Sequence, residues 1–359
     1  MTKETRPVAA RRRELLRQLL PAGAPRLWCP LLTHYRDDGS LDLERTARQL
    51  DAIRPHVGGL LLAGSTGDGW ELDEAQRQRL VAEMLPLARE RGFAVLLGVL
   101  KPTAQGMRQA MAATVAALCA QAGTDDPTEA FARCGVAALT LCAPHGQALS
   151  QDELGSALDE LLASGVPVSL YQLPQVTGNR IAAATYAALV ARHANLLMLK
   201  DTSGEDTLAQ AADDADGVLL LRGAEGGYAR HPKAGGGRYD GALLSTANGL
   251  GAALGGVLDA LCAGRREQAQ ALSARIEAVV EPVFAAAAAL PVGNAFTNAN
   301  KALDHVMAHG EAAGMAQPPR LHAGTRLPRE FVATAAAALA RQGLAPARGY
   351  LQNRTGSSA

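Results

Sequence analysis

Cysteine is scarce in this chain, and no two cysteines are placed as a pair. The 359 residues include five cysteines, at positions 29, 119, 134, 142 and 262, with no C-x-x-C spacing among them. A scattered and odd-numbered set of this kind argues against a disulfide framework and against a cysteine-based zinc site. We therefore expect reduced thiols and a cytoplasmic protein.

The chain also lacks an excess of charge and a long apolar run. Its 35 basic and 35 acidic residues give a formal net charge of zero, which argues against a nucleic-acid-binding surface and a polybasic membrane-binding patch. No apolar run reaches the roughly 18 residues of a membrane span. The N-terminus contains Arg11-Arg12-Arg13 but not the apolar core of a secretory signal, so it predicts a short cationic helix.

What the sequence does contain is a series of short apolar runs. Eight of them lie between residues 26 and 245, and most are continuous rather than alternating. Continuous short runs are typical of parallel strands that are buried on both faces. They occupy residues 26–33, 58–64, 93–99, 136–142, 167–171, 196–200, 217–222 and 241–245.

Alanine-rich amphipathic segments separate these runs, so strand and helix alternate eight times. This alternation predicts an α/β fold of the (β/α)8 TIM barrel type, whose usual length is about 250 residues. A doubly wound open sheet is the alternative. That fold usually has about five or six strands, and the chain has no G-x-G-x-x-G after its first apolar run.

The same patterns divide the chain into four parts. We expect an N-terminal helical segment at 1–25, the barrel at 26–264, a C-terminal helical extension at 265–345 and a disordered tail at 346–359. The extension shows helical patterns near 265–288, 296–309 and 328–342. The third barrel helix is expected at about 103–132, with an insertion on the barrel surface near 123–130, where the sequence reads GTDDP at 123–127.

One apolar run ends on a residue that is reluctant to be buried. In LLMLKDTSGED, residues 196–206, apolar residues lead directly to Lys200 and a turn. Lysine is almost never fully buried unless it is paired or functional. An amine in a site of low dielectric loses its proton more easily and becomes a nucleophile. The alternative is a lysine that reaches the surface from the end of a strand.

Residues at the ends of the other runs add to this candidate, because TIM barrels place their chemistry at the C-terminal ends of the strands. The run before Lys200 ends at Tyr171, and neighbouring strands lie about 4.8 Å apart, so a phenol and an amine can reach one substrate. GSTGDG at 64–69 offers the hydroxyls of Ser65 and Thr66 and backbone N–H groups that could hold a carboxylate. Taken separately, that segment is also typical of an ordinary loop, and Tyr171 of a tyrosine at the rim.

Three segments together resemble the dihydrodipicolinate synthase and N-acetylneuraminate lyase family of class I aldolases. GSTGD at 64–68 is similar to the family's GTTGE, YQLPQVTG at 171–178 to YNxPxxTG, and LKDTSGED at 199–206 to the IKDSSGD motif around the Schiff-base lysine. The resemblance covers roughly residues 26–345. It implies a barrel with C-terminal helices and a homo-oligomer, either a dimer or a tetramer.

The resemblance also implies a role for each matching residue. Lys200 would condense with the ketone of pyruvate or another 2-oxo acid, and Tyr171 would move protons. Ser65 and Thr66 would hold the carboxylate, and one of them would extend the proton path of the tyrosine. The implied catalytic residues are Lys200, Tyr171 and Thr66, and the implied pocket positions are Gly64, Ser65, Thr66, Gly223, Leu243 and Ser245.

No metal or cofactor is expected. A protonated imine is itself an electron sink that stabilises the neighbouring carbanion as an enamine. The sequence has no cluster of histidine, aspartate and glutamate with metal-ligand spacing.

The chain departs from the family pattern at positions that select the substrate. Val176 stands where the synthases have an arginine, and Arg180, four residues further on, is a weak substitute. Pro144-His145-Gly146 replaces a segment with two tyrosines. His145 could replace a lost tyrosine as an acid or base in the substrate site, because histidine exchanges protons near neutral pH. The alternative is a loop histidine without a role.

These departures predict a lyase, either an aldolase or a dehydratase, that acts on a small-molecule 2-oxo acid. The substrate would be a 2-oxo-3-deoxy sugar acid, or pyruvate plus an aldehyde. Its hydroxyls could be read by His145, Gln172, Trp70 and Ser245. The alternatives are a dihydrodipicolinate synthase (4-hydroxy-tetrahydrodipicolinate synthase), a non-catalytic barrel that binds a sugar acid or a phosphate near 233–241, and an interaction protein.

Overall fold

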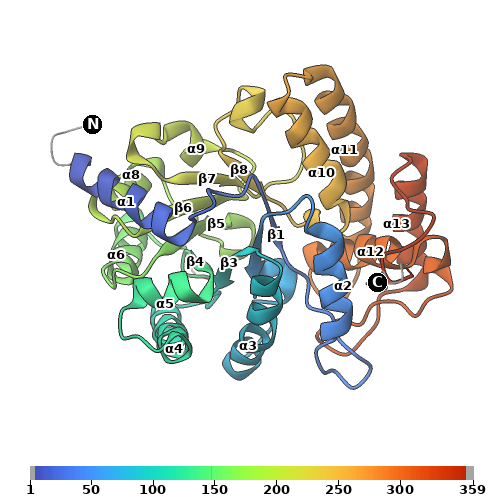
Figure 1. Cartoon of the computed structure of the whole chain (residues 1–359), viewed down its shortest axis with the longest axis horizontal. Helices are drawn as coiled ribbons and strands as arrows, with labels where there is room; N and C mark the ends of the chain where they lie inside the picture. The colour runs from blue at the N-terminus through green and yellow to red at the C-terminus, as the bar shows by residue number, and fades with distance from the viewer. Residues whose placement is uncertain (1–4, 147, 353–359) are drawn as a thin grey trace, which may run out of the picture.

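Eight parallel strands form a closed barrel in the computed structural model, which describes residues 5–146 and 148–352 (Figure 1). Each strand pairs with the next along the chain, and β1 closes onto β8 through the pairs Leu27↔Ala242 and Trp28↔Leu243. The predicted TIM barrel is confirmed. Its strands are β1 (Leu27–Pro30), β2 (Gly59–Leu62), β3 (Ala94–Gly98), β4 (Val136–Cys142), β5 (Val168–Gln172), β6 (Leu196–Asp201), β7 (Leu219–Arg222) and β8 (Gly241–Leu243).

Helices surround these strands, and nearly every strand residue is buried between the barrel interior and the helical layer. This explains why the runs are continuous and not alternating, since both faces of each strand avoid water. The helices are α1 (Thr5–Leu19), α2 (Leu43–Ile53), α3 (Glu74–Glu90), α4 (Ala104–Ala122), α5 (Pro127–Cys134), α6 (Gln151–Leu162), α7 (Pro174–Thr177), α8 (Ala183–Arg192), α9 (Thr207–Ala211), α10 (Ala247–Cys262), α11 (Arg266–Ala288), α12 (Ala295–His309) and α13 (Arg329–Arg341).

The third connection contains two separate helices rather than one long, interrupted helix. α4 ends at Gly123, which adopts the left-handed conformation with φ 65° that favours glycine. α5 then begins after Asp126, whose side chain accepts the N–H groups of Thr128 and Glu129. The sequence GTDDP at 123–127 therefore combines a stop signal with a start signal.

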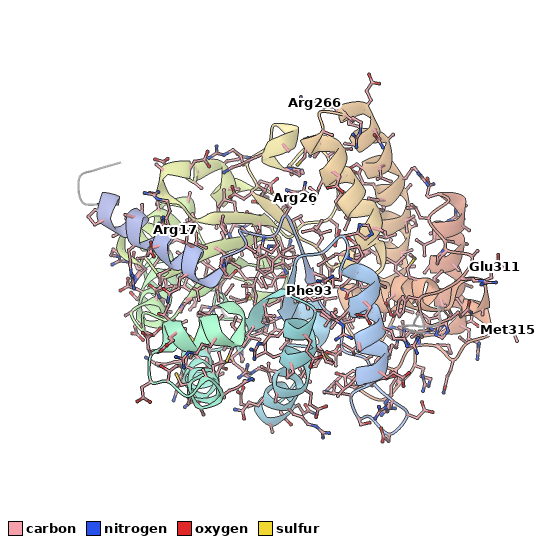
Figure 2. All side chains as sticks on the ribbon, in the orientation of Figure 1. Arg17, Arg26, Phe93, Arg266, Glu311 and Met315 are labelled. Atoms are coloured by element: carbon pink, nitrogen blue, oxygen red, sulfur yellow. The ribbon has the colours of Figure 1, made fainter. Side chains whose placement is uncertain are left out.

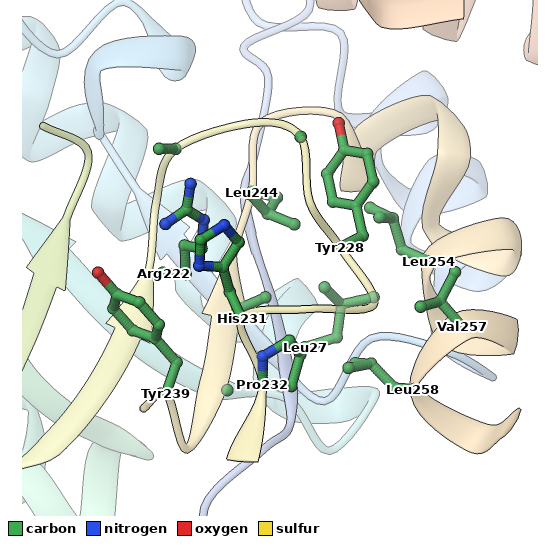
Figure 3. Close-up of a pocket in the computed structure, with 14 residues that line it drawn as sticks. Leu27, Arg222, Tyr228, His231, Pro232, Tyr239, Leu244, Leu254, Val257 and Leu258 are labelled. Carbon is green, nitrogen blue, oxygen red and sulfur yellow. The ribbon is translucent and has the colours of Figure 1, made fainter. Parts of the chain in front are cut away.

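The seventh connection differs from the predicted alternation, because the described chain between β7 and β8 forms only the short 3₁₀ turn η3 (Lys233–Gly235). Glycine is unfavourable inside a helix, and Gly235, Gly236 and Gly237 follow one another here. With α10, this connection encloses a largely apolar cavity of about 20 Å³ (Figure 3). That space suits about one water molecule and is too small for a substrate.

The predicted N-terminal helix is present as α1, and one of its arginines is buried. Arg12 is 1% exposed. Its guanidinium donates to the backbone oxygens of Val190, His193 and Leu196 at 2.6, 2.8 and 2.7 Å, and so fastens α1 to the end of α8 and the start of β6. Burial lowers the pKa of Arg12. Its neighbours Arg11 and Arg13 are exposed, as are Arg17, Arg26 and Arg266 (Figure 2).

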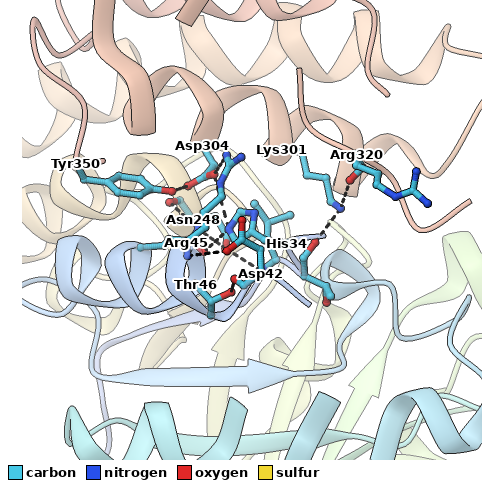
Figure 4. A network of polar contacts seen from close by, with 12 residues as sticks. His34, Asp42, Arg45, Thr46, Asn248, Lys301, Asp304, Arg320 and Tyr350 are labelled. Atoms are coloured by element: carbon cyan, nitrogen blue, oxygen red, sulfur yellow. Dashed lines mark hydrogen bonds and ion pairs between the residues drawn. The ribbon is translucent and has the colours of Figure 1, made fainter. Parts of the chain in front are cut away.

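The three helices after the barrel lie where the sequence placed them, beside α10 and α2 (Figure 1). α12 is buried along almost its whole length. Its Asp304 accepts hydrogen bonds from Arg45 and Tyr350, both at 2.8 Å (Figure 4). The predicted disorder of 346–359 is therefore wrong for the segment up to Gln352, because the Tyr350 hydroxyl is anchored, whereas 353–359 lie outside the described residues.

No helix within residues 5–146 and 148–352 is long and apolar enough to cross a membrane.

Candidate active site

Lys200 and Tyr171 lie side by side at the C-terminal end of the barrel strands. They are partners in the register of β5 and β6, and the Lys200 Nζ atom lies 3.9 Å from the centre of the Tyr171 ring. The two residues are 4% and 3% exposed. The amine and the phenol that the sequence suggested are thus brought together in a buried position.

Lys200 differs from the other lysines of the described chain in having no ionic partner. Lys101 pairs with Glu74 at 3.1 Å, and Lys233 pairs with Asp214 and Asp240. Lys301 is as buried as Lys200, but its Nζ donates to the backbone oxygens of Thr33 and Arg320. Among residues 5–146 and 148–352, only Lys200 combines burial with an amine that is not held by an oxygen atom.

Gly223, at the end of β7, provides the space for this lysine. A methyl group at Gly223 would lie 2.9 Å from Lys200 Cε and 2.2 Å from Thr202 Oγ1. Real Cβ contacts are longer than this, so a larger residue would displace one or both side chains. The structure therefore places Gly223 directly against the lysine.

Gly64, Ser65 and Thr66 belong to a tight turn that follows β2. Ser65–Gly67 form the 3₁₀ turn η1, and Asp68 ends it in the left-handed conformation with φ 63°. A methyl group at Gly67 would lie 2.4 Å from Leu31 O, so the turn packs closely on the chain after β1. The first N–H groups of a helical turn have no partner within that turn. Ser65 and Thr66 thus supply both hydroxyl and N–H donors.

The C-terminal extension holds this turn in place. Thr297 of α12 donates from Oγ1 to Thr66 O at 3.1 Å. Asp68 accepts a hydrogen bond from the Tyr35 hydroxyl at 2.9 Å and forms an ion pair with Lys301 at 3.7 Å. Burial lowers the pKa of Lys301, and Asp68 opposes the shift. The sequence analysis did not identify Thr297 and Lys301, because the groups that they contact lie 231 and 268 positions away in the chain.

Six apolar side chains form a cluster at this end of the barrel, which we call the mouth cluster. Its buried members are Leu100, Cys142, Tyr171 and Leu173, and Trp70 and Val176 pack on them half-buried. Burial raises the pKa of the Cys142 thiol, and the charge of Lys200 opposes the shift. Trp70 also donates from Nε1 to Ser65 Oγ at 3.0 Å. The mouth cluster therefore joins the Tyr171 side of the site to the Ser65 turn.

His145 lies at the rim of this region, beside Trp70. The two ring centres are 5.8 Å apart, and the His145 side chain is exposed. Its loop is tied down by the backbone bond from His145 N to Pro102 O at 2.7 Å. Asn179 also donates from Nδ2 to Pro144 O at 2.7 Å. His145 is thus close to the mouth cluster but is not packed against the lysine.

The polar groups after β7 and β8 are bonded mainly to one another. Ser245 Oγ donates to Glu225 at 2.7 Å, and Glu225 also accepts hydrogen bonds from Thr246 Oγ1 and the Tyr228 hydroxyl. Leu243 is fully buried and pairs with Trp28 of β1. Glu225 thus organises the residues that follow β8, a role that no local sequence pattern indicated.

Two other side chains that the sequence suggested as substrate contacts, Gln172 and Arg180, are bonded to other protein groups. Gln172 points away from Tyr171, because both ends of its amide bond the backbone of Ile181, at 3.0 and 3.1 Å. Gln172 is therefore a structural residue rather than a reader of substrate hydroxyls. Arg180 forms a solvent-exposed ion pair with Glu205, so this guanidinium already has a carboxylate partner.

In the part of the chain that the structure describes, no three histidine, cysteine, aspartate or glutamate side chains are grouped so that they could hold a metal ion. The five cysteines are unpaired.

Comparison with known proteins decides the family. Residues 24–302 match the profile of the Dihydrodipicolinate synthetase family. The chain belongs to this family. As a member it is a lyase of the class I aldolase type, and the resemblance inferred from its three motifs is confirmed.

Relatives and solved structures of the family are similar over most of their length. A 4-hydroxy-tetrahydrodipicolinate synthase of Streptomyces coelicolor is 27% identical over 266 residues, covering 72% of this chain and 78% of the relative. YagE of E. coli K12, a prophage protein of the family solved with pyruvate, has a TM-score of 0.69 at 18% identity and covers 89% of this chain and 99% of its own. A variant of the Sulfolobus solfataricus 2-keto-3-deoxygluconate aldolase has a TM-score of 0.68 at 14% identity, with 89% and 96% covered. At these identities the two structures support the fold alone.

Proposed function

We propose that this family member forms an imine between Lys200 and a 2-oxo acid, and that it makes or breaks a bond next to that imine. The observation that carries the proposal is the pairing of Lys200 with Tyr171 in the barrel register, with the amine 3.9 Å from the ring centre. Burial of both residues supports it, because an amine shielded from water and free of a carboxylate can act as a nucleophile.

The chemistry follows from these two groups. The amine of Lys200 attacks C2 of the 2-oxo acid, and the carbonyl oxygen leaves as water after it has received protons. The phenol of Tyr171 is the acid–base group next to the amine and relays those protons. The protonated imine then accepts the electron pair of a neighbouring C–H or C–C bond, which gives the enamine. In a dehydration, the enamine formed by loss of the C–H proton expels a β-hydroxyl group, which leaves with the C–O electron pair, takes up a proton and is released as water. Hydrolysis of the imine regenerates Lys200.

The turn at Ser65 and Thr66 is the proposed binding site for the substrate carboxylate. Hydroxyl and N–H donors bind an anion without the need for a cationic side chain. The bond from Thr297 to Thr66 O and the contacts of Asp68 hold this turn against α12. Thr66 is thus both a binding residue and a candidate for the proton path of Tyr171.

The proposed substrate is pyruvate, joined to or released from an aldehyde. YagE, a structural neighbour, is described in complex with pyruvate, and another neighbour is a 2-keto-3-deoxygluconate aldolase. Dihydrodipicolinate synthesis is the second candidate, because the curated relatives carry that name. Two observations speak against it: Val176 offers no charge to a second carboxylate, and Arg180 is paired with Glu205.

The imine is tested by trapping with borohydride in the presence of pyruvate, followed by intact mass and peptide mapping. We expect one reduced pyruvate adduct on Lys200 and none in the Lys200→Arg variant. Lys301 is the internal control, because it is equally buried but bonded to backbone oxygens. Labelling at Lys101, Lys233 or Lys301 in place of Lys200 would overturn the assignment.

We also propose that the protein is a homo-oligomer, either a dimer or a tetramer, and that it works in a reducing, cytoplasmic environment. The family membership supports the first statement and the five unpaired cysteines support the second. Light scattering that gives only a 37.2 kDa particle at micromolar concentration would contradict the oligomer.

A further inference from the structure

The outer part of the mouth cluster leaves two apolar side chains partly exposed beside Tyr171. Trp70 and Val176 are half-buried and lie on the buried residues that surround Tyr171. They come from different loops, one after β2 and one in α7, and therefore form a wall rather than a single protruding side chain. The exposed ring of His145 lies beside Trp70 and forms a polar edge of this wall.

Two of the polar side chains that the sequence suggested as readers of substrate hydroxyls, Gln172 and Ser245, are already bonded elsewhere. Gln172 bonds the backbone of Ile181 at both ends of its amide. Ser245 donates its proton to Glu225. A sugar chain that extended past Tyr171 would thus meet apolar carbon where its hydroxyls need partners, and an unpaired buried hydroxyl is unfavourable.

Two basic side chains near the strand ends are also already in ion pairs. Arg180 pairs with Glu205, and Lys101 pairs with Glu74. A second carboxylate on the substrate would therefore find no free cation at these positions. The wall instead fits an apolar substituent on the substrate, because burial of apolar surface is favourable. An aromatic ring offers a large apolar surface of this kind.

We propose that the carbonyl partner of pyruvate is an aldehyde with an aromatic or branched apolar substituent, which packs against Trp70 and Val176. This inference rests on the imine at Lys200 proposed above. In the addition direction, the enamine carbon derived from the pyruvate methyl group attacks the aldehyde carbon. One C–C bond forms, the aldehyde oxygen takes up a proton, and hydrolysis of the imine releases a 4-hydroxy-2-oxo acid. The cleavage direction reverses each of these steps.

Trp70 also orients Ser65, and this role can be tested separately from its packing against the substrate. Its indole N–H donates to Ser65 Oγ at 3.0 Å. Since the indole can only donate, the Ser65 hydroxyl must send its own proton to another acceptor. The ring of Trp70 therefore contributes to substrate selection, and its N–H is a positioning group for Ser65.

The test compares aldol addition of pyruvate to benzaldehyde, D-glyceraldehyde and aspartate semialdehyde. We expect kcat/KM for benzaldehyde to exceed that for D-glyceraldehyde by about tenfold or more, the scale on which apolar pockets discriminate. Trp70→Ala should lower kcat/KM for benzaldehyde by about tenfold. Trp70→Phe, which keeps a ring and loses the N–H, should leave the KM for benzaldehyde nearly unchanged and lower kcat several-fold.

Val176→Arg tests the second residue of the wall, because it replaces an apolar side chain with a guanidinium. This variant should lose activity with benzaldehyde and gain activity with aspartate semialdehyde. Val176→Thr, which keeps the shape, should lose benzaldehyde activity without that gain. Met315→Arg is the matched control, because Met315 is 88% exposed and lies in the C-terminal extension, at the edge of the molecule (Figure 2).

Borohydride trapping with pyruvate alone separates the two proposals. If pyruvate labels Lys200 but kcat/KM for D-glyceraldehyde equals or exceeds that for benzaldehyde, the apolar-substrate inference is overturned and the proposed imine is retained. Failure of pyruvate to label Lys200 would overturn the proposed function and this inference with it. Labelling of Lys200 together with a preference for benzaldehyde that Val176→Arg abolishes would support both.

Discussion

Replacing Gly223 by alanine is the smallest change that acts directly on the proposed nucleophile. The added methyl group would lie 2.9 Å from Lys200 Cε and 2.2 Å from Thr202 Oγ1, whereas ordinary contacts begin at 3.4 Å. Lys200 Cε must therefore retreat by about 0.5 Å, and the threonine hydroxyl by more. The two shortest contacts are to side-chain atoms, and the third, to the backbone oxygen of Asp201, is 3.2 Å and only slightly tight. The stability cost therefore falls at the low end of the ~1–3 kcal/mol range for overpacking.

The effect on the reaction should be larger than the effect on stability. A misplacement of about 1 Å in a reacting group can cost about 10²-fold in rate. For Gly223→Ala we therefore expect the rate of pyruvate trapping at Lys200 to fall about 10- to 100-fold, while the thermal unfolding temperature drops by only a few degrees. Trapping kinetics by intact mass and a thermal melt on the same sample measure the two effects.

Gly314→Ala is the matched control for this substitution. Gly314 also has an ordinary backbone conformation, but nothing lies within 4 Å of a Cβ placed on it. This variant should trap pyruvate at the wild-type rate. If Gly223→Ala also traps pyruvate at the wild-type rate, the packing of Gly223 against the lysine has no bearing on catalysis and the reasoning is refuted.

Three other outcomes are expected. Tyr171→Phe should keep the fold and slow turnover by about 10²-fold or more, which steady-state kinetics will show; a near-normal rate would move the proton relay elsewhere. Arg12→Ala should cost about 3–5 kcal/mol in urea unfolding, since it removes the donor to four backbone oxygens, those of Val190, His193, Leu196 and Asp216, whereas the exposed Arg11→Ala should change little. Burial lowers the pKa of His305 from 6.5 to about 4. As the pH falls from about 6.5 to 4, the His305 imidazole therefore binds a proton in the unfolded chain before it does so in the folded chain, and the free energy of unfolding falls. His305→Gln should reduce this fall, by ~3 kcal/mol at most, in unfolding curves measured across that pH range.

The parts of the fold that were predictable are those encoded by local pattern. Continuous apolar runs identify buried parallel strands because both faces of such a strand avoid water. The two differences from the predicted fold, in the third and seventh connections, also have local causes. In both, turn-forming residues interrupt the helical pattern. Gly123 and Asp126 split the third connection into two helices, and the run of glycines at 235–237 leaves the seventh connection without a helix in the described chain.

The proximity of Tyr171 and Lys200 was predictable for a related reason. Tyr171 and Lys200 end consecutive strands, and consecutive strands are neighbours in a barrel. Their side chains therefore meet without any information about distant parts of the chain. The motifs around them were also specific enough to indicate the family, which the match over residues 24–302 confirms.

The sequence by itself thus determined the barrel, its strand ends, the lysine–tyrosine pair and the family. Only the tertiary structure decided which polar groups remain available to a substrate, because their partners lie far away in sequence. Lys301 is held by the backbone oxygen of Thr33, 268 positions away, and Arg12 by that of Leu196, 184 positions away. No local periodicity encodes such contacts; barrel closure and the docking of α1 and α12 create them, and they separate the free amine of Lys200 from the bonded amine of Lys301.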